Sequence, residues 1–318
     1  MLLKKLNYRE IHCKSACTKI KRPMPYKWDL NIYRGCSHNC IYCYALYSHK
    51  YLKSNGNNND FFTDIFVKSN IVEELEKQLS KPSWKGEIIN IGGVTDSYQE
   101  LESELEIMPQ ILETLIKHKN PAIISTKSDL ILRDIDLVNE LSEITYINVA
   151  GSITTLDENI RKIIEPNAKP SKNRVKMLKH IKMNTNASVG FHMMPIIPYI
   201  TDSYSNLDEL FKGVKIANAD YIIPGTLNLY GKTRKFFLNF AVNNFKNEYK
   251  NIRSAYTKHN PDRDYLQEFY KNISKLKSKY DVSSDYKSII LEKTGKNIEK
   301  IDNSQKQDNS IQSTLFDY

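Results

Sequence analysis

Three cysteines close together are the residues of this chain best suited to chemistry. Cys36, Cys40 and Cys43 lie within eight residues in the spacing CxxxCxxC, and Tyr42 precedes the last of them. Four cysteine thiolates saturate a [4Fe-4S] cluster. Three leave one iron without a protein ligand, much as a catalytic zinc site keeps one open position. We therefore expect this loop to hold a [4Fe-4S] cluster whose open iron can chelate a small molecule and pass it an electron.

A structural zinc site is the main alternative for the same thiolates. Either His38 or His49 could complete a set of four zinc ligands. No second CxxC pair and no HxxxH follows in the sequence, so the spacing favours the cluster. Cys13 and Cys17 form a separate CxxxC, which we interpret as small apolar side chains because a pair needs further ligands to close a metal site.

The elements that must position the cysteines alternate between strands and helices. Short apolar strands are predicted at residues 29–33, 65–67, 88–91, 122–125, 146–150, 188–194 and 221–223. From residue 87 onward, helical spacing of apolar residues follows each strand but the last, which predicts a parallel sheet with right-handed crossovers. Counting the strand before the cysteines gives about six units, which predicts an α/β fold, an open partial (β/α)6 barrel.

Composition divides the chain into four parts. Residues 1–27 are predicted to be an irregular lead-in, and residues 28–225 to be the barrel. Residues 226–300 are an aromatic-rich helical extension that caps the barrel or covers its open side. Residues 301–318 are polar and lack periodicity, which predicts a disordered tail.

Small and polar residues follow several of the predicted strands. Functional groups of parallel barrels lie at the C-terminal ends of their strands. Gly92 and Gly93 would let the backbone approach a ligand closely, and Thr95 adds a hydroxyl. Lys127 and Ser152 follow the next two strands. Their shared register predicts one pocket above the cysteine loop.

Several short runs resemble the radical S-adenosylmethionine (SAM) proteins related to spore photoproduct lyase, a DNA-repair-photolyase-like subgroup. The similarity covers roughly residues 10 to 225, and its runs are residues 31–36, 91–99, 126–128, 132–134 and 152–157. The resemblance implies a radical SAM barrel with a [4Fe-4S] cluster and SAM as cofactors. In that superfamily SAM binds the open iron, and its reductive cleavage yields a 5′-deoxyadenosyl radical that abstracts hydrogen.

The resemblance also implies roles for particular residues. The three cysteines would hold the cluster, and Tyr42 would contact the adenine of SAM. Lys127 and Ser152 match positions that contact the SAM carboxylate and ribose, and Thr95 matches another position on the SAM side.

The chain departs from that subgroup at one position. Spore photoproduct lyase returns hydrogen to its product from a cysteine on the loop after the second strand. Gly93 stands there in this chain, and no cysteine follows Cys43. Tyr98 is a conceivable hydrogen donor, but we interpret it as a structural side chain. The departure argues against cleavage of the spore photoproduct itself.

The charge of the chain is compatible with a polyanionic partner such as DNA. The formal net charge is +9, yet only nine of the 46 basic residues are Arg. The excess of Lys also follows from the codon bias of an AT-rich genome, and Lys is the weaker choice for bidentate phosphate contacts. Charge alone therefore favours nucleic acid only slightly.

The last residues contain a second motif that points to DNA. Gln312, Leu315 and Phe316 resemble the peptide by which bacterial polymerases and repair proteins dock on the sliding clamp. Gln would hydrogen-bond at the rim of the clamp pocket while Leu and Phe fill an apolar groove. An accidental apolar tail is the alternative.

Together these features predict a radical SAM enzyme with a lyase-like reaction, an external electron donor and a nucleic-acid lesion or modified nucleotide as substrate. The rivals are a radical SAM enzyme acting on a peptide, tRNA or small metabolite, and a non-catalytic clamp-associated DNA-binding protein. An odd cysteine count, no secretory signal and no apolar run long enough for a bilayer predict a cytoplasmic protein without membrane contact.

Overall fold

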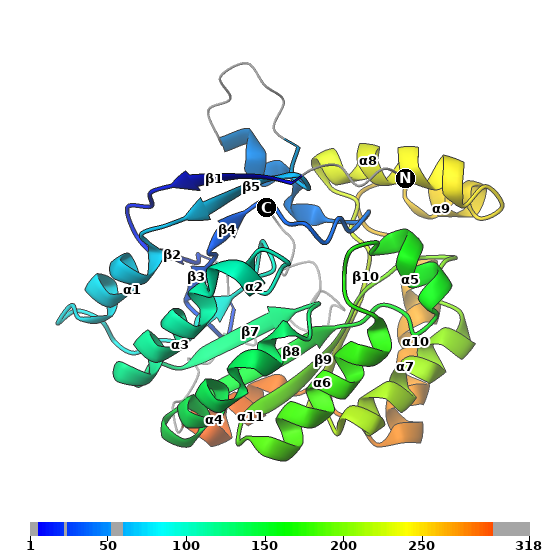
Figure 1. Ribbon diagram of the computed structural model, residues 1–318. Helices are drawn as coiled ribbons and strands as arrows, with labels where there is room; N and C mark the ends of the chain where they lie inside the picture. The colour runs from blue at the N-terminus through cyan, green and yellow to red at the C-terminus, as the bar shows by residue number, and fades with distance from the viewer. Residues whose placement is uncertain (1–5, 22–23, 52–59, 295–318) are drawn as a thin grey trace.

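A seven-stranded sheet lies at the centre of the computed structural model, which describes residues 6–21, 24–51 and 60–294 (Figure 1). The strand order is β10-β9-β8-β7-β6-β3-β2, and only β2 (Cys17–Lys19) pairs antiparallel, at one edge. The six parallel strands are β3 (Trp28–Leu30), β6 (Ile89–Ile91), β7 (Ala122–Thr126), β8 (Ile147–Ser152), β9 (Ser188–Ile196) and β10 (Tyr221–Thr226). The predicted open barrel of six units is confirmed.

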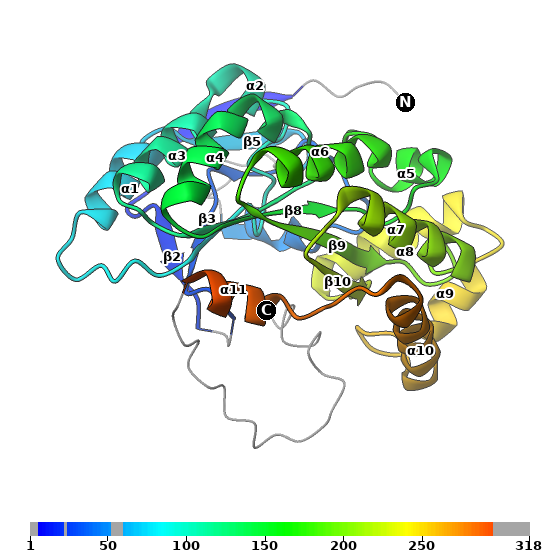
Figure 2. The ribbon, with the colours of Figure 1, turned by 90° about the horizontal axis from the view of Figure 1, so that it is seen from below.

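Helices cover the outer face of this sheet (Figure 2). They are α1 (Ile71–Leu79), α3 (Ile107–Lys117), α4 (Ile135–Ile144), α6 (Ser171–Asn184) and α7 (Tyr204–Ala217). Shorter helical turns connect the elements at η1 (Tyr44–Tyr51), α2 (Glu102–Leu105), η2 (Leu130–Asp134) and α5 (Glu158–Ile164). Helix α3 shows why they pack there. Its buried residues Met108, Ile111, Leu112 and Leu115 recur every three or four positions and form one apolar stripe.

The N-terminal segment is not the irregular lead-in that its sequence predicts. Strand β1 (Asn7–Ile11) pairs with β5 (Asp64–Lys68), which also pairs with β4 (Tyr33–Arg34), so the three form a small second sheet. The side chains of β1 are almost all exposed, so the strand has no apolar alternation to reveal it. The predicted strand 29–33 is divided between the two sheets, and 65–67 lies in the small sheet rather than in the barrel.

The C-terminal extension forms α8 (Gly231–Asn244), α9 (Tyr249–Ala255), α10 (Arg263–Tyr280) and α11 (Tyr286–Thr294). Helices α8 and α9 share a buried core with the cysteine loop, to which Cys40, Phe237 and Ile252 contribute. Helix α11 lies on the face of the sheet opposite the outer helices (Figure 2). Its Ile290 packs there against Ile123 of β7 and Tyr146. The extension therefore covers both the cysteine loop and part of the inner face of the barrel.

Two further predictions concern the clamp-like motif and contact with a membrane. The clamp-like motif at Gln312, Leu315 and Phe316 lies outside the described residues and stays a prediction. Among the described residues, no helix is both long and apolar enough to cross a membrane.

Candidate active site

The cysteine loop follows β4, and distant parts of the chain fix its backbone. The side chain of Gln99, from the loop after β6, accepts the backbone N–H of Ser37 at 2.9 Å across 62 residues of sequence. Beyond Cys36 the chain turns tightly, and the N–H of Cys43 donates to the carbonyl of Cys40 at 3.1 Å. The shape of the loop therefore depends on the barrel around it as well as on its own sequence.

Helix α8 supports the same loop from the other side. The hydroxyl of Thr233 donates to the carbonyl of Cys43 at 2.8 Å. The side chains of Cys40 and Tyr42 are buried in the core that contains Phe237 of α8. The extension is thus part of the framework that holds the cysteines in place.

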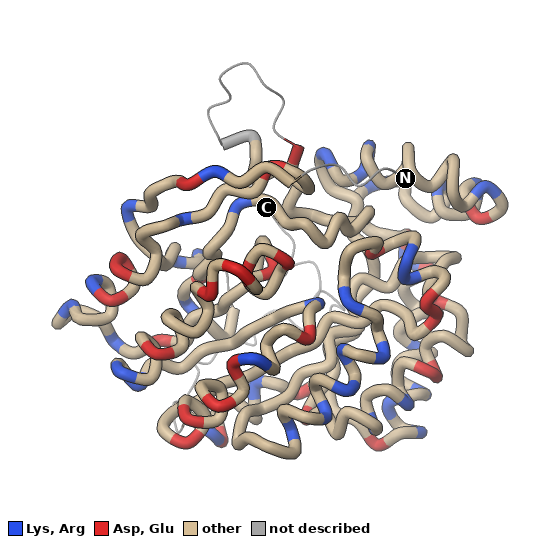
Figure 3. The backbone as a smooth tube through the Cα atoms, viewed as in Figure 1, with Lys and Arg blue, Asp and Glu red and all other residues tan. Residues whose placement is uncertain are grey.

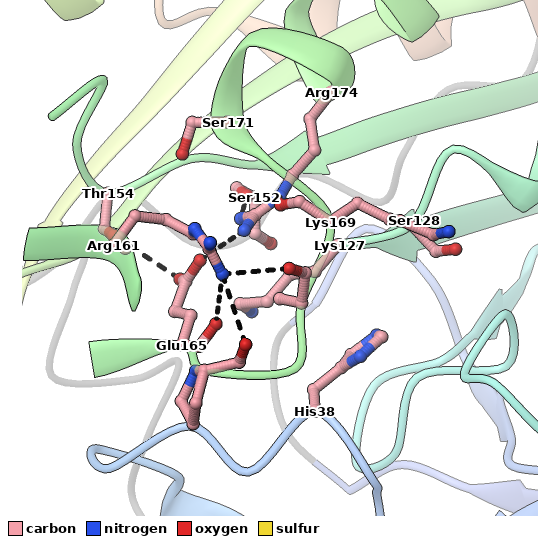
Figure 4. A network of polar contacts seen from close by, with 12 residues as sticks. His38, Lys127, Ser128, Ser152, Thr154, Arg161, Glu165, Lys169, Ser171 and Arg174 are labelled. Atoms are coloured by element: carbon pink, nitrogen blue, oxygen red, sulfur yellow. Dashed lines mark hydrogen bonds and ion pairs between the residues drawn. The ribbon is translucent and has the colours of Figure 1, made fainter. Parts of the chain in front are cut away.

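A buried ion pair anchors the loop to the end of β8. Arg174 Nη2 lies 2.5 Å from Glu165 Oε2, and neither side chain is exposed. The hydroxyl of Tyr42 donates to the other carboxylate oxygen of Glu165, and Arg174 Nη1 donates to the carbonyl of Ser152 at 2.7 Å. Figure 4 shows Glu165, Arg174 and Ser152 gathered with Lys127 beside them. Burial opposes the charge of Glu165, but Arg174 and Lys127 outweigh it and lower the pKa of the carboxyl.

A second buried carboxylate joins the cysteine loop to β7. Asp96 Oδ2 lies 2.9 Å from His38 Nε2 and accepts the backbone N–H of Lys127 at 2.7 Å. Its Oδ1 accepts the hydroxyl of Thr126 at 2.8 Å. Burial disfavours the carboxylate, yet His38 and these donors hold the pKa of Asp96 at about 2. Nε2 of His38 is therefore engaged by a carboxylate and is not free to bind a metal.

The three thiols are suited to be the ligands of an iron–sulfur cluster. All are free, and burial raises the pKa of Cys36, Cys40 and Cys43 to about 12. A coordinated metal reverses this effect, because a ligating thiol is deprotonated outright. Among the described residues, no three His, Cys, Asp or Glu side chains converge on a point that could hold a single metal ion. All three thiols line one pocket, and a [4Fe-4S] cluster takes one thiolate on each of three irons.

Eight of the nine residues predicted for the site line one cavity of about 570 Å³. They are Cys36, Cys40, Tyr42, Cys43, Gly92, Gly93, Lys127 and Ser152. Thr95 is the exception: its buried hydroxyl donates to the carbonyl of Tyr33 at 3.0 Å, so it supports the loop from behind. Its neighbours Val94 and Asp96 line the cavity instead.

The paired glycines are required by close packing. Gly92 has a φ of +83°, and a Cβ there would lie 2.8 Å from the carbonyl oxygen of Ser125. A Cβ on Gly93 would lie 2.6 Å from Nδ2 of Asn90. The position of Gly93 therefore has no room for a side chain unless Asn90 moves.

Strand register builds the inner wall of the cavity below the cysteines. In one row, Ser152 of β8 is level with His192 of β9, which is level with Ile223 of β10. Two residues earlier, Ala150 is level with Gly190 and Gly190 with Tyr221. The ring of Tyr221 lies over Gly190, where a Cβ would be 2.3 Å from its hydroxyl. Small residues in this second row leave space that a single aromatic side chain enters.

Polar side chains lie at or just behind the floor of the cavity, among apolar ones such as Ile123 and Ile223. The hydroxyl of Tyr221 donates to Asn148 Oδ1 at 2.8 Å, while Asn148 Nδ2 is buried with no hydrogen-bond partner among the described residues. Asn90 Nδ2 donates to Asp29 Oδ1 at 2.8 Å. Burial, and then the charge of Lys127, lowers the pKa of His192 to about 4, so its imidazole is neutral at physiological pH. Such a floor can hydrogen-bond a polar ring or amide.

The C-terminal extension completes the wall. Tyr230 and Lys232 reach the cavity from the start of α8, and Tyr286 reaches it from α11. Sequence reasoning assigned no site residue to this region because its aromatic residues are also those expected of a packed helical cap.

Sequence reasoning also missed Glu165, Arg174 and His192. Glu165 lies in an irregular loop, and Arg174 is a basic residue on a helix rich in basic residues, so neither carries a local signal. His192 could have been found, because it is the one ionisable residue in the otherwise apolar strand β9.

Cys13 and Cys17 lie apart from the cavity. Cys17 is buried at the start of β2, and burial raises the pKa of its thiol to about 12. The thiol of Cys13 lies 3.4 Å from Asn70 Oδ1. Neither lines the cavity, which agrees with their interpretation as structural side chains.

Comparison with known families gives a match over most of the barrel. Residues 30–211 match the family model described as the Radical SAM superfamily. An uncharacterized protein of Mycobacterium tuberculosis is 30% identical over 291 residues, which cover 89% of this chain and 83% of the relative. An uncharacterized protein of Methanocaldococcus jannaschii is 31% identical over 176 residues, covering 55% of this chain and 62% of the relative.

Solved structures of spore photoproduct lyase share the fold. The enzyme complexed with dinucleoside spore photoproduct has a TM-score of 0.63 at 11% identity and covers 86% of this chain and 79% of its own. A double mutant of that enzyme, with bound AdoMet and dinucleoside spore photoproduct, has a TM-score of 0.60 at 11% identity, covering 85% and 78%. At this identity the likeness shows the fold alone.

Proposed function

This chain belongs to the radical SAM superfamily, and from that premise we propose that it abstracts hydrogen from a damaged or modified nucleotide of DNA. Its cofactors are a [4Fe-4S] cluster and SAM, and it needs an external electron donor. When bound, the cluster and SAM supply a 5′-deoxyadenosyl radical. The observation that carries the proposal is one cavity lined both by the three thiols and by polar side chains such as Asn90 and His192.

Each residue of the cysteine end has a distinct part in this proposal. Cys36, Cys40 and Cys43 hold the cluster. The ammonium of Lys127 is directed at the SAM carboxylate and lies 5.9 Å from the centre of the Tyr42 ring. Because Glu165 fixes the hydroxyl of Tyr42, its ring is available as a flat surface for the adenine.

The remaining residues position SAM and the substrate. Ser152, at the end of β8, would contact the ribose of SAM. Gly92 and Gly93 keep side chains away from the wall between the two ends of the cavity. A nucleobase presents ring amides and carbonyls, which the floor residues Asn90 and His192 can hydrogen-bond. Nucleotide recognition and the lyase-like outcome remain proposals.

The experiment that tests this function uses uniformly deuterated, UV-irradiated single-stranded DNA. Protein reconstituted with iron and sulfide without oxygen is mixed with dithionite, SAM and this DNA, and 5′-deoxyadenosine is measured by mass spectrometry. We expect several-fold more 5′-deoxyadenosine than without DNA, with deuterium in the product, and none from Cys40→Ala. Formation at an equal rate without DNA, and without deuterium transfer, would exclude a nucleotide substrate and favour a peptide or small metabolite.

A further inference from the structure

The segment from residue 231 to residue 260 carries much of the charge of the chain. It contains seven Lys and Arg residues, one Glu and no Asp, so it accounts for +6 of the formal net charge of +9. It comprises helices α8 and α9 and the turn after them. Figure 3 shows Lys and Arg along both helices.

Part of this segment borders the mouth of the cavity. Tyr230, Gly231 and Lys232 line the cavity, and α8 extends outward from there (Figure 1). Lys235 lies one helical turn after Lys232, so the two are neighbours on the helix surface. The backbone N–H of Leu229 donates to the carbonyl of His259 at 2.7 Å, which brings the turn after α9 to the same place.

We define the basic–aromatic rim as the residues Tyr230, Lys232, Lys235, Lys258 and His259. Its three lysines are exposed, and within the described part of the chain none of them forms an ion pair. Arg234 differs, because its guanidinium donates to the carbonyls of residues 256 and 258 and so supports the rim. The rim lysines therefore remain available to an anion from solution.

The rim also presents an aromatic surface. Tyr230 is 57% exposed, and its ring and that of His259 meet edge to face with centroids 5.7 Å apart. Lysines beside exposed rings are the combination that single-strand binding proteins use, because the lysines follow the phosphates while the bases stack.

Helix α6 shows that many basic residues do not by themselves create a surface like the basic–aromatic rim. Helix α6 is also rich in Lys, but its Arg174 pairs with Glu165 and its Lys182 with Asp220. Its exposed residues Lys176 and Lys179 do not line the cavity, and no aromatic side chain of α6 accompanies them. Codon bias is a sufficient explanation for the exposed lysines of α6. The lysines of the basic–aromatic rim differ from them because they lie near the mouth of the cavity and beside the exposed ring of Tyr230.

We propose that the basic–aromatic rim binds a single strand of DNA next to the nucleotide that enters the cavity. Lys232 and Lys235 hold phosphates, and Tyr230 stacks on a neighbouring base. This inference rests on the proposed function and assigns the recognition of DNA to the C-terminal extension, which lies beyond the residues 30–211 matched by the family model.

The test measures binding of a fluorescein-labelled oligothymidylate of about 12 nucleotides by fluorescence anisotropy, over a series of salt concentrations. The protein is the full chain, reconstituted without oxygen. The variants are Lys232→Ala/Lys235→Ala, Tyr230→Ala and Tyr230→Phe. The matched control is Lys176→Ala/Lys179→Ala on α6, which removes the same charge from exposed positions.

If the basic–aromatic rim binds a single strand of DNA, each variant should give a distinct result. The Lys232→Ala/Lys235→Ala protein should bind about tenfold more weakly at low salt, and its slope of log K against log salt should fall by about 1.4, or about 0.7 for each phosphate contact. Tyr230→Ala should weaken binding about fivefold or more without changing the slope, and Tyr230→Phe should restore it, because stacking needs the ring alone. The control should bind as the unaltered protein does.

Four outcomes would overturn the proposal for the basic–aromatic rim. Equal losses from the rim pair and the α6 pair would mean that binding follows net charge only. An unchanged salt slope in the rim pair would mean that its lysines do not meet phosphates, and either result leaves DNA-stimulated release of 5′-deoxyadenosine intact. Tighter binding of oligouridylate of the same length would make RNA the partner. No binding by the unaltered protein would overturn the rim and the DNA substrate together.

Discussion

The two ends of the cavity are built in different ways. At the cysteine end, three thiols come from eight consecutive residues, and buried charges, above all the Glu165–Arg174 pair, hold the loop. At the floor, single residues from separate strands, such as His192 and Tyr221, meet a helix of the C-terminal extension. The contrast shows that the cysteine end depends on a few buried charges acting on one loop, whereas the floor depends on the register of several separate strands.

The largest expected effect lies at the cysteine end, where Arg174→Met leaves the carboxylate of Glu165 buried and without its cation. We expect the free energy of unfolding to fall by about 3–5 kcal/mol, measured by urea denaturation without oxygen. The double variant Glu165→Leu/Arg174→Met should recover most of this loss, because no unpaired charge remains. A loss below about 1 kcal/mol for the single variant would show that the pair does not hold this end.

An intermediate effect is expected at the floor and depends on pH. The folded-state pKa of His192 is about 4, below its ordinary 6.5, because burial and Lys127 disfavour the imidazolium. Its contribution to stability is therefore fully present above pH 6.5 and is lost as the pH falls towards 4, by about 2–3 kcal/mol in total. Urea denaturation from pH 7 down to pH 4 should show a shallower decline for His192→Gln than for the unaltered protein. Parallel curves would mean that the imidazole is not buried as described.

The smallest effect is expected from Tyr221→Phe, which removes one hydroxyl from the floor. Asn148 then loses the donor to its Oδ1, so we expect a loss of about 1–2 kcal/mol in the free energy of unfolding. Tyr199→Phe is the matched control, since Tyr199 is 41% exposed and should change stability by less than about 0.5 kcal/mol. Release of 5′-deoxyadenosine without substrate should be unchanged in both variants. A Tyr221→Phe protein that lost this release would contradict the separation of the two ends.

Sequence reasoning predicted the cysteine end better than the floor, for a physical reason. The cysteines are adjacent in sequence, and Lys127 and Ser152 lie at strand ends that apolar periodicity locates. The ion pair and the floor depend on which residues share a level across strands far apart in the chain, as His192 and Ser152 do. A single sequence, read without an alignment of related sequences, carries no signal for which residues share a level across strands.

The errors in the predicted fold have a similar origin. Strand β1 is held by backbone pairing with β5 while its side chains face solvent, so neither periodicity nor composition distinguishes it from a loop. The helices were predictable because each buries a continuous stripe, as α3 does. Thr95 was placed correctly on its loop, but the direction of its side chain follows from a hydrogen bond to Tyr33 that the sequence does not reveal.

Electron paramagnetic resonance of the reduced, anaerobically reconstituted protein, with and without SAM, tests the central claim most directly. We expect about four irons and four sulfides per chain, and a signal of the reduced cluster that changes when SAM is added because one iron has no protein ligand. The signal should be absent from Cys36→Ala, Cys40→Ala and Cys43→Ala. Bound zinc without sulfide, or a cluster signal that SAM leaves unchanged, would contradict the account.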